Sequence, residues 1–274
     1  MSAPFELAVL GSPVAHSLSP VMHEAGLAAL GLTGSYLAID VDESGMRRHA
    51  DLVRSGALTG ANITMPHKRI AAELADVLTE TAARAGAVNT WYRQEGALFG
   101  HTTDVHGVRE VIVRRSLPTT SILVLGNGGA AAAALVACDG MPLSVSARTE
   151  VKARRLVDYT GVEARVVEWG TAAPGALIVN ATPIGMLGES LPPGLMDVAG
   201  GVFDMTYGDR PSPALVQARS NGLPHADGID LLAAQAEASF EIWTGLRPPD
   251  GLFEHVARNA SRSPNPAPIQ RRSE

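Results

Sequence analysis

The sequence lacks several features that define particular classes of protein. It holds one cysteine, Cys138, so an internal disulfide framework and a cysteine-rich zinc site are excluded. Its longest stretch of small apolar residues, 130–137, is too short to cross a bilayer, which takes about 20 residues. The first residues have neither the basic start nor the long apolar core of a signal peptide. We therefore expect a soluble, cytoplasmic protein.

The sequence also has fewer basic than acidic residues. The 274 residues contain 22 Lys and Arg against 28 Asp and Glu, which gives a net charge of −6. This balance argues against general binding to nucleic acid or to an anionic membrane. Hydrophobic residues make up 46% and charged residues 18%, a globular composition that excludes a wholly disordered chain. The length predicts one large domain or two modest ones.

Strands and helices are predicted to alternate along the chain, which favours an α/β layer structure. The first hundred residues predict strands at 7–10, 35–41 and 60–64, a hairpin at 88–92 and 98–100, and helices after 20, at 43–55 and at 70–85. A second series predicts helices at 105–115, from 130 and at 150–159, with strands at 121–125, 143–147, 164–168, 176–180 and 201–204. Further helices are expected at 228–244 and 251–260. The polar, proline-rich tail 261–274 is expected to be disordered.

The turn after the strand at 121–125 is rich in glycine. It runs Gly126, Asn127, Gly128 and Gly129, and Ala130 opens the next helix. Glycines in such a turn let the backbone approach a pyrophosphate, and the helix N-terminus supplies unpaired N–H groups. The spacing departs from the full G-x-G-x-x-G pattern, so a tight turn in a fold that binds no nucleotide is the alternative.

The next strand ends at Arg148 and Thr149. An enzyme that uses NAD usually has Asp or Glu at this point, to accept a hydrogen bond from the ribose 2′-hydroxyl. Here a guanidinium stands there instead, and its fork suits a 2′-phosphate. The sequence therefore favours NADP over NAD. The alternative is that this segment is only the solvated, basic start of a helix.

Polar side chains gather at the strand ends of the N-terminal half. Ser17 and Ser19 precede a helix, where they either hold an anion or cap the helix. Asn62 and Thr64 share one side of a short strand, and Asn89 follows an apolar pair. The ends of strands are where an α/β sheet collects its ligand-binding residues.

Lys68 and Asp104 are candidates for proton transfer. Each follows one of these polar strand ends, and a Lys and an Asp near one hydroxyl exchange its proton during redox chemistry at that carbon. The alternative is a plain surface salt bridge, the commoner outcome for a Lys–Asp pair.

Taken together, these segments resemble the shikimate dehydrogenase family over roughly residues 7–246. Eight motifs occur in the family's order: Gly11–Pro13 with His16–Pro20, Asn62–Lys68, Gly86–Thr90, Thr103–Asp104, Gly126–Ala130, Asn180–Met186, Asp204–Tyr207, and Gly228–Gln235 with Trp243–Gly245. The resemblance implies an N-terminal α/β substrate domain and a Rossmann-type dinucleotide-binding domain with a central cleft. The corresponding boundaries are 1–104 for the substrate domain, 105–227 for the NADP domain, 228–260 for helices that pack back on the first domain, and 261–274 for the tail.

The resemblance also implies a role for each candidate residue. Lys68 and Asp104 match the catalytic pair. The residues that match substrate contacts are Ser17, Ser19, Asn62, Thr64, Asn89, Tyr207 and Gln235. Those that match cofactor contacts are Gly126, Asn127, Gly128, Gly129, Ala130, Arg148, Thr149, Thr182, Met205 and Gly228. The implied reaction is the reversible reduction of 3-dehydroshikimate by NADPH, without a metal, in a monomer or homodimer that serves aromatic amino acid biosynthesis.

Several positions depart from the family pattern. Thr102 stands where the family commonly has Asn, Ala147 replaces another Asn, and Gly208 and Asp209 follow Tyr207 in place of Asn-Pro. These changes leave open a related enzyme that acts on quinate, an aminoshikimate or an aminoquinate. From a different class, a non-catalytic module that binds the cofactor for regulation is a further alternative.

Overall fold

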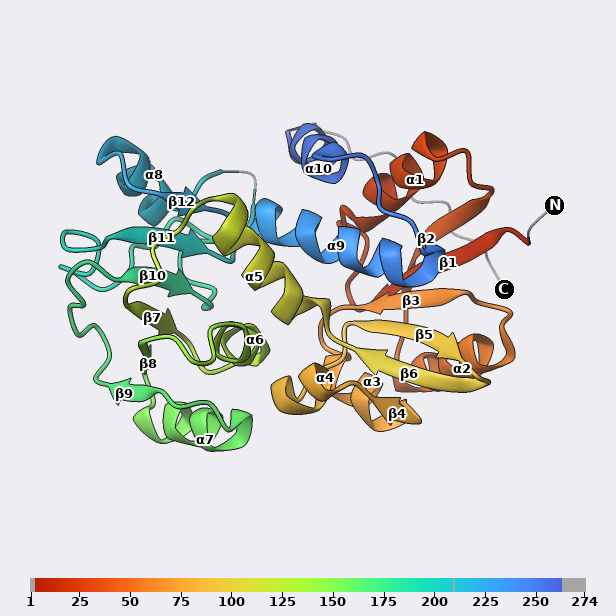
Figure 1. Cartoon of the computed structure of the whole chain (residues 1–274), viewed down its shortest axis with the longest axis horizontal. Coiled ribbons are helices and arrows are strands. Elements are labelled where there is room, and N and C mark those ends of the chain that lie inside the picture. Colours follow the sequence, from red (N-terminus) through yellow and green to blue (C-terminus); the bar gives the residue numbers. More distant parts are fainter. Residues whose placement is uncertain (1–2, 209, 263–274) are drawn as a thin grey trace. The chain divides into compact units, whose positions relative to one another are not determined.

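The computed structural model describes residues 3–208 and 210–262 (Figure 1). The chain forms two compact units, one of residues up to 103 together with those from 235 onward, and one of residues 104–234. Each unit is built on its own β-sheet, so the predicted α/β class is confirmed. The predicted disordered tail lies outside the described residues, apart from residues 261 and 262.

The first unit has a mixed sheet with the strand order β2-β1-β3-β5-β6-β4. β1 runs parallel to β2 and β3, whereas β5 is antiparallel to β3 and β6. The strands are β1 (Phe5–Gly11), β2 (Gly34–Asp40), β3 (Gly60–Ile63), β4 (Val77–Leu78), β5 (Thr90–Gln94) and β6 (Ala97–His101). The helices are α1 (Ser19–Ala29), α2 (Glu43–Ser55), α3 (Lys68–Leu74), α4 (Glu80–Ala85), α10 (Leu252–Ser261) and the C-terminal part of α9 (Gly228–Thr244).

Strand β1 divides its side chains between two hydrophobic cores. Ala8 and Leu10 join the core formed with α2, whereas Leu7 and Val9 join the core that contains Trp243. This division follows from the pleat, because successive side chains of a strand point to opposite faces. The sheet is therefore covered on both sides, and the N-terminal strand holds both cores together.

The single helix predicted over 70–85 is wrong. The structure has α3, then strand β4, then α4. The helix stops because Asp76 makes longer-range bonds. Its carboxylate accepts hydrogen bonds from Arg54 and from the backbone N–H of Leu98, and its own N–H donates to the Leu98 carbonyl. The Thr79 hydroxyl then accepts a hydrogen bond from the N–H of Ala82 and starts α4.

Helix α1 packs closely against the two C-terminal helices. A Cβ atom built on Gly26 would lie 2.8 Å from ring atoms of Phe240 and of Phe253, so only glycine admits both rings. The two phenylalanine rings meet edge to face at 5.6 Å between centroids. The C-terminal segment thus completes the core of the first unit.

The second unit has an all-parallel sheet with the order β12-β11-β10-β7-β8-β9. Counted from β7, this is the doubly wound order of dinucleotide-binding folds. The strands are β7 (Ile122–Leu125), β8 (Leu143–Ser146), β9 (Arg165–Val167), β10 (Leu177–Asn180), β11 (Gly201–Asp204) and β12 (His225–Ala226). The helices are α5 (Thr103–Arg114), α6 (Gly129–Ala137), α7 (Glu150–Thr160), α8 (Pro213–Ser220) and the first part of α9.

Helix α6 is made of small residues and is buried from Ala131 to Ala137. Arg109 of α5 donates hydrogen bonds to the carbonyls of Val136 and Ala137, which satisfies acceptors at the buried C-terminus of α6. Within the described residues, no helix combines the length and the hydropathy that a membrane crossing requires.

Candidate functional site

The glycine-rich turn follows β7 at the switch point of the parallel sheet, where the chain turns toward β8 on one side and β10 on the other. Gly126 has a φ of +126°, and a Cβ atom built there would lie 2.8 Å from the Ala181 carbonyl oxygen. Its N–H donates to the carbonyl of Ser146 at the end of β8. Glycine is therefore required at this position by backbone conformation and by close packing.

The next two glycines differ from Gly126 because they face open space. A Cβ atom built on Gly128 or Gly129 meets no described atom within 4 Å. Gly128 is the N-cap of α6 without a side-chain cap, so the first N–H groups of the helix stay available. Open space, available N–H groups and a helix N-terminus together suit the pyrophosphate of a dinucleotide.

The corner between β8 and α7 carries uncompensated positive charge. Arg148 and Thr149 are exposed, and so are Lys152 and Arg155 at the start of α7. In the part of the chain that the structure describes, none of these three cations has an ion-pair partner, whereas Arg154 pairs with Glu150.

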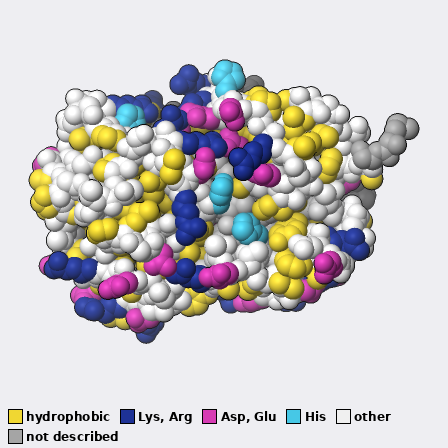
Figure 2. All heavy atoms as spheres, viewed as in Figure 1, with side chains coloured by type: hydrophobic (Ala, Val, Ile, Leu, Met, Phe, Trp, Pro, Cys, Tyr) yellow, Lys and Arg dark blue, Asp and Glu magenta, His cyan; other side chains and the backbone are white. Residues whose placement is uncertain are grey.

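Elsewhere on the surface, acidic and basic side chains intermingle (Figure 2). Several arginines pair with a glutamate one helical turn away, namely Arg69–Glu73, Arg114–Glu110 and Arg258–Glu254. The unpaired corner at Arg148 differs from these neutralised faces, and it suits the additional phosphate of NADP better than the free ribose of NAD.

Two buried polar residues organise the loops after β10 and β11. Asn180 donates through Nδ2 to the Asp204 carboxylate at 3.0 Å, and both side chains are fully buried. The Asn180 Oδ1 accepts from the N–H and the hydroxyl of Thr182. Asp204 accepts from the N–H and hydroxyl of Thr206 and from the Ser212 hydroxyl. Thr182 and Met205 therefore stand on loops that this pair fixes.

Gly228 makes a second close backbone approach in the second unit. A Cβ atom built there would lie 2.5 Å from the Thr206 carbonyl oxygen and 2.8 Å from that of Met205. Its N–H donates to the Thr206 carbonyl. The structure thus joins the start of α9 to the loop that carries Met205.

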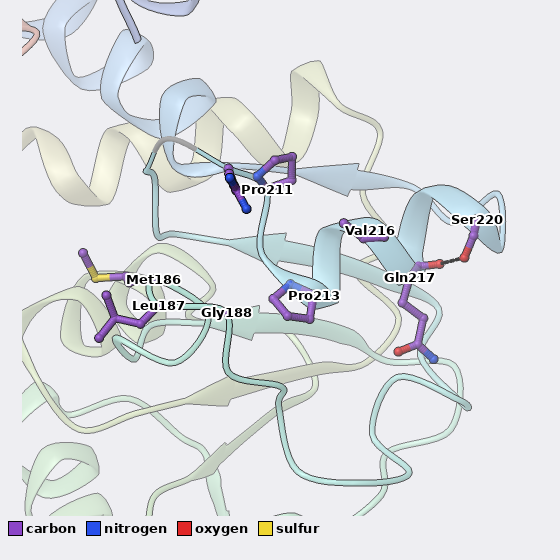
Figure 3. A pocket seen from close by; sticks show the side chains of 10 residues that line it. Met186, Leu187, Gly188, Pro211, Pro213, Val216, Gln217 and Ser220 are labelled. Atoms are coloured by element: carbon purple, nitrogen blue, oxygen red, sulfur yellow. Dashed lines mark hydrogen bonds between the residues drawn. The ribbon is translucent and has the colours of Figure 1, made fainter. Parts of the chain in front are cut away.

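A surface groove of about 810 Å³ lies beside these loops (Figure 3). It is bordered by Met186 and Leu187 on one side and by Pro211, Pro213 and Val216 on the other. The Glu189 carboxylate accepts the N–H groups of Gly185 and Leu187 and so fixes one wall. None of the predicted site residues lines this groove, which separates it from the site proposed below.

In the first unit, Ser17 and Ser19 lie at the start of α1. The Ser17 hydroxyl accepts a hydrogen bond from the Ser19 N–H, and Ser19 is buried. The N-cap of α1 is Leu18, which offers no side-chain cap. Of the two serines, Ser17 therefore accepts a backbone N–H at the start of the helix, as the capping interpretation expects, but it is not the N-cap residue.

Three hydrogen bonds fix the loop that carries Thr64 and Lys68. The Met65 carbonyl accepts from the Ser12 N–H, and the buried His67 ring bonds to the Val41 carbonyl at 2.7 Å. The Lys68 carbonyl accepts from the Val88 N–H. Lys68 is thus the first residue of α3, on a backbone that neighbouring loops hold in place.

Asn62 and Asn89 belong to one hydrogen-bond network across the sheet. Asn62 donates to the Asn89 carbonyl and to the Thr90 hydroxyl, and Thr90 donates to Asn89 Oδ1. Asn89 in turn bonds to both the N–H and the hydroxyl of Thr103. The network ends one residue before Asp104, which is itself buried.

The remaining predicted residues differ in exposure. Tyr207 is 44% exposed, whereas Gln235 is half-buried on α9. Thr102 is 1% exposed, and its hydroxyl has no hydrogen-bond partner among residues 3–208 and 210–262. An Asn-to-Thr difference from the family pattern thus coincides with an unsatisfied buried hydroxyl.

Sequence reasoning missed the polar residues that act behind the predicted contacts. These are Tyr36, His67, Asn180, Asp204 and Ser239. His67, Asn180 and Asp204 fall inside motifs of the family pattern, and Asn180 and Asp204 also end their strands, which are the available signals for them. Among the described residues, no group of three or more potential ligands is arranged to hold a metal ion.

Comparisons with known proteins identify the family. The shikimate dehydrogenase substrate binding domain matches residues 9–91, and the shikimate 5′-dehydrogenase C-terminal domain matches residues 228–258. An NADP(+) shikimate dehydrogenase from Thermus thermophilus is 39% identical over 92% of this chain and 97% of its own length. The chain belongs to the shikimate dehydrogenase family.

Solved structures agree with this membership. A shikimate 5-dehydrogenase from Thermus thermophilus, in complex with NADP(H) and shikimate, superposes with a TM-score of 0.84 at 38% identity, over 93% of this chain and 99% of that one. A 5-ketofructose reductase from Gluconobacter sp. also reaches 0.84, at 25% identity over 94% of this chain and 99% of that one. The fold therefore also occurs in an enzyme named for a different ketone.

Proposed function

We propose that this protein is an NADP-dependent shikimate dehydrogenase, which interconverts 3-dehydroshikimate and shikimate by hydride transfer. The observation that carries the proposal is the end-to-end similarity to the Thermus thermophilus NADP(+) enzyme, at 39% identity over 92% of the chain. The Arg148 corner supports the choice of NADP, because it offers unpaired cations and no carboxylate at the end of β8.

The second unit supplies the proposed cofactor site. Gly126, Asn127, Gly128, Gly129 and Ala130 would hold the pyrophosphate, and Arg148 with Thr149 would hold the 2′-phosphate. Thr182, Met205 and Gly228 would form the wall of the nicotinamide site, on the loops fixed by Asn180 and Asp204. The bound cofactor supplies or accepts the hydride.

The substrate carboxylate is assigned to the hydroxyls of Ser17, Ser19 and Tyr207. Asn62, Thr64, Asn89 and Gln235 are assigned to the ring hydroxyls. The common feature of this set is a neutral hydrogen-bonding group on a fixed backbone, which selects a polyhydroxylated ring acid by pairing rather than by charge.

Lys68 and Asp104 are the proposed catalytic pair. As shikimate is oxidised, the proton of the reacting hydroxyl leaves to the Lys68 Nζ or the Asp104 carboxylate, and the same group returns it to the oxygen in reduction. Asp104 is buried, which limits its contact with water.

The test is a matrix of initial rates, followed by the absorbance of reduced nicotinamide. Shikimate, quinate and an amino analogue are each offered with NADP and with NAD, and 5-ketofructose is offered with NADPH. Dominant turnover of shikimate with NADP is expected. Preference for another acid would mean that the same residues act on a related substrate. Cofactor binding without any turnover would favour the non-catalytic regulatory module.

We infer in addition a cytoplasmic enzyme that works as a monomer or homodimer. The biosynthetic substrate supports a location inside the cell. Sedimentation of the purified chain measures the oligomeric state directly.

A further inference from the structure

The side chain of Asn62 is hydrogen-bonded through both its oxygen and its nitrogen. Its Oδ1 accepts from the Tyr36 hydroxyl at 2.6 Å and from the Ser239 hydroxyl at 3.5 Å. Its Nδ2 donates to the Asn89 carbonyl and to the Thr90 hydroxyl, both at 3.2 Å. An amide nitrogen only donates and an amide oxygen only accepts, so these neighbours determine the orientation of Asn62.

The direction of each bond is determined from the two ends of this network. The Asn89 carbonyl only accepts, which turns Nδ2 toward it and leaves Oδ1 facing Tyr36. Thr90 then donates to Asn89 Oδ1 at 2.9 Å, and Asn89 Nδ2 donates to the Thr103 hydroxyl at 3.0 Å. The Thr103 N–H returns a bond to Asn89 Oδ1 at 2.8 Å. The bonds run in one consistent direction from β2 to the residue before Asp104, and bonds aligned in this way strengthen one another.

Tyr36 donates the shortest hydrogen bond in this network, and its ring is held rigidly. Its ring is 1% exposed and stacks on His23 with 4.3 Å between centroids and 2° between planes. Burial raises the pKa of Tyr36 well above its ordinary value, so the hydroxyl remains a donor across the working pH range. Burial lowers the pKa of His23 to about 3, so the stacked ring is neutral.

We propose that Tyr36 is a positioning residue for the substrate site. Its hydroxyl orients the Asn62 amide, and through Thr90 and Asn89 it holds the backbone that leads into Asp104. Tyr36 lies on β2, whereas Asn62 lies on β3, with β1 between them. The inference rests on the proposed function, because Asn62 and Asn89 are there assigned to the substrate ring.

The test compares Tyr36→Phe with Tyr92→Phe. Both remove a phenol hydroxyl from the same sheet, but the Tyr92 hydroxyl has no partner within the described ranges, and its ring packs on Phe99 at 5.3 Å. We expect Tyr36→Phe to raise the KM of shikimate about tenfold, as for one lost hydrogen bond at an oriented group, without a change in the Kd of NADP. Tyr92→Phe should leave both constants at their wild-type values.

A second measurement does not depend on turnover. The Thr103 N–H lies at the far end of the network, so its hydrogen exchange should become about tenfold faster in Tyr36→Phe. The Leu98 N–H, which bonds to Asp76 instead, serves as the internal control and should keep its rate. Ser239→Ala removes the long bond to Asn62 together with bonds to carbonyls of its own helix, and it should give the same changes at smaller size.

The outcomes separate the two proposals. If Tyr36→Phe lowers only the melting temperature, with wild-type shikimate KM and Thr103 exchange, Tyr36 is a packing residue and the inference is overturned. If the wild-type protein prefers another acid, the KM comparison is made with that acid. If it turns over none, the proposed function fails, and the exchange rate of Thr103 alone decides the role of Tyr36.

Discussion

The amide of Asn180 donates to the carboxylate of Asp204 across two neighbouring parallel strands, at 3.0 Å. Both residues end their strands and both are buried, so this bond couples two loops at one edge of the sheet. Those loops carry Thr182 and Met205. The pair therefore determines where the wall of the proposed nicotinamide site stands.

Asn180→Asp should disrupt this coupling with almost no change in volume. It places a second carboxylate against Asp204, and two buried like charges at hydrogen-bond distance are strongly unfavourable. We expect the free energy of unfolding to fall by about 3 kcal/mol at neutral pH, and to recover in part on acidification as one proton is shared. Urea unfolding at several pH values measures both effects. Asn221→Asp, at an exposed helix end, is the control and should show neither.

Lys68→Ala should lower kcat by about 10²- to 10⁴-fold, the usual contribution of a positioned acid or base. The NADP Kd and the melting temperature should change little, because Lys68 lies at a helix start rather than in a core. Arg69→Ala is the matched control, since Arg69 is exposed and, among residues 3–208 and 210–262, forms an ion pair with Glu73 alone. Near-normal turnover of Lys68→Ala would remove this lysine from the mechanism.

Arg148→Ala should weaken NADP by about tenfold or more while it leaves NAD nearly unaffected, since a charged hydrogen bond to phosphate contributes about 1.5–3 kcal/mol. Titration calorimetry with both cofactors gives the two constants. Arg154→Ala removes a neighbouring guanidinium that is already paired with Glu150 and should have a smaller effect. Equal losses for NADP and NAD would contradict the 2′-phosphate assignment.

Thr102→Val should stabilise the protein. The Thr102 hydroxyl is buried without a partner among the described residues, and an unpaired buried hydroxyl costs about 1–3 kcal/mol. Valine has the same shape and removes the polar atom. Thr90→Val makes the same chemical change where the hydroxyl has partners, and it should destabilise instead. Calorimetric melting distinguishes the two signs.

His23 should make the stability depend on pH. Its pKa is lowered by burial from 6.5 to about 3, and its near neighbours are the aromatic rings of Tyr36, Phe240, Trp243 and Phe253. The unfolded chain therefore binds a proton below pH 6.5 that the folded chain does not. Above that pH, His23 does not reduce the free energy of unfolding. As the pH falls toward 3, His23 alone lowers the free energy of unfolding by about 1.4 kcal/mol per pH unit.

The measurement is urea unfolding of the wild type and of His23→Leu at pH values from about 7.5 down to about 5, which covers both sides of pH 6.5, where the linkage begins. The variant should show a shallower loss of stability with acid, whatever its absolute stability. Identical slopes would mean that His23 is protonated in the folded protein.

The sequence predicted best those elements whose signals are local. Helices α2 and α9 match their predicted bounds, and α2 has both an Asp42 cap and a left-handed Gly56 end. The β5–β6 hairpin turns at Glu95 and Gly96, both with positive φ, as a tight two-residue turn requires. In the same way, the glycine turn at Gly126 was visible because its conformation demands a particular residue.

The parts that were missed depend on distant partners. The break between α3 and α4 rests on Arg54 and Leu98, and no local pattern encodes it. Tyr36 is 26 residues from Asn62, and Ser239 is 177 residues from it, so neither contact can be deduced from spacing. Helix α8 and strand β12 were also missed, because eight and two residues carry too short a pattern.

The close contact of Gly26 with Phe240 and Phe253 has a consequence for biosynthesis on the ribosome. The first unit is discontinuous, since residues up to 103 need those from 235 onward to fill their core. The second unit is one uninterrupted stretch, 104–234, and all its strands emerge before that C-terminal segment does. Because domains fold as units during synthesis, the second unit is complete first, and the first unit must wait for the last helices to be translated.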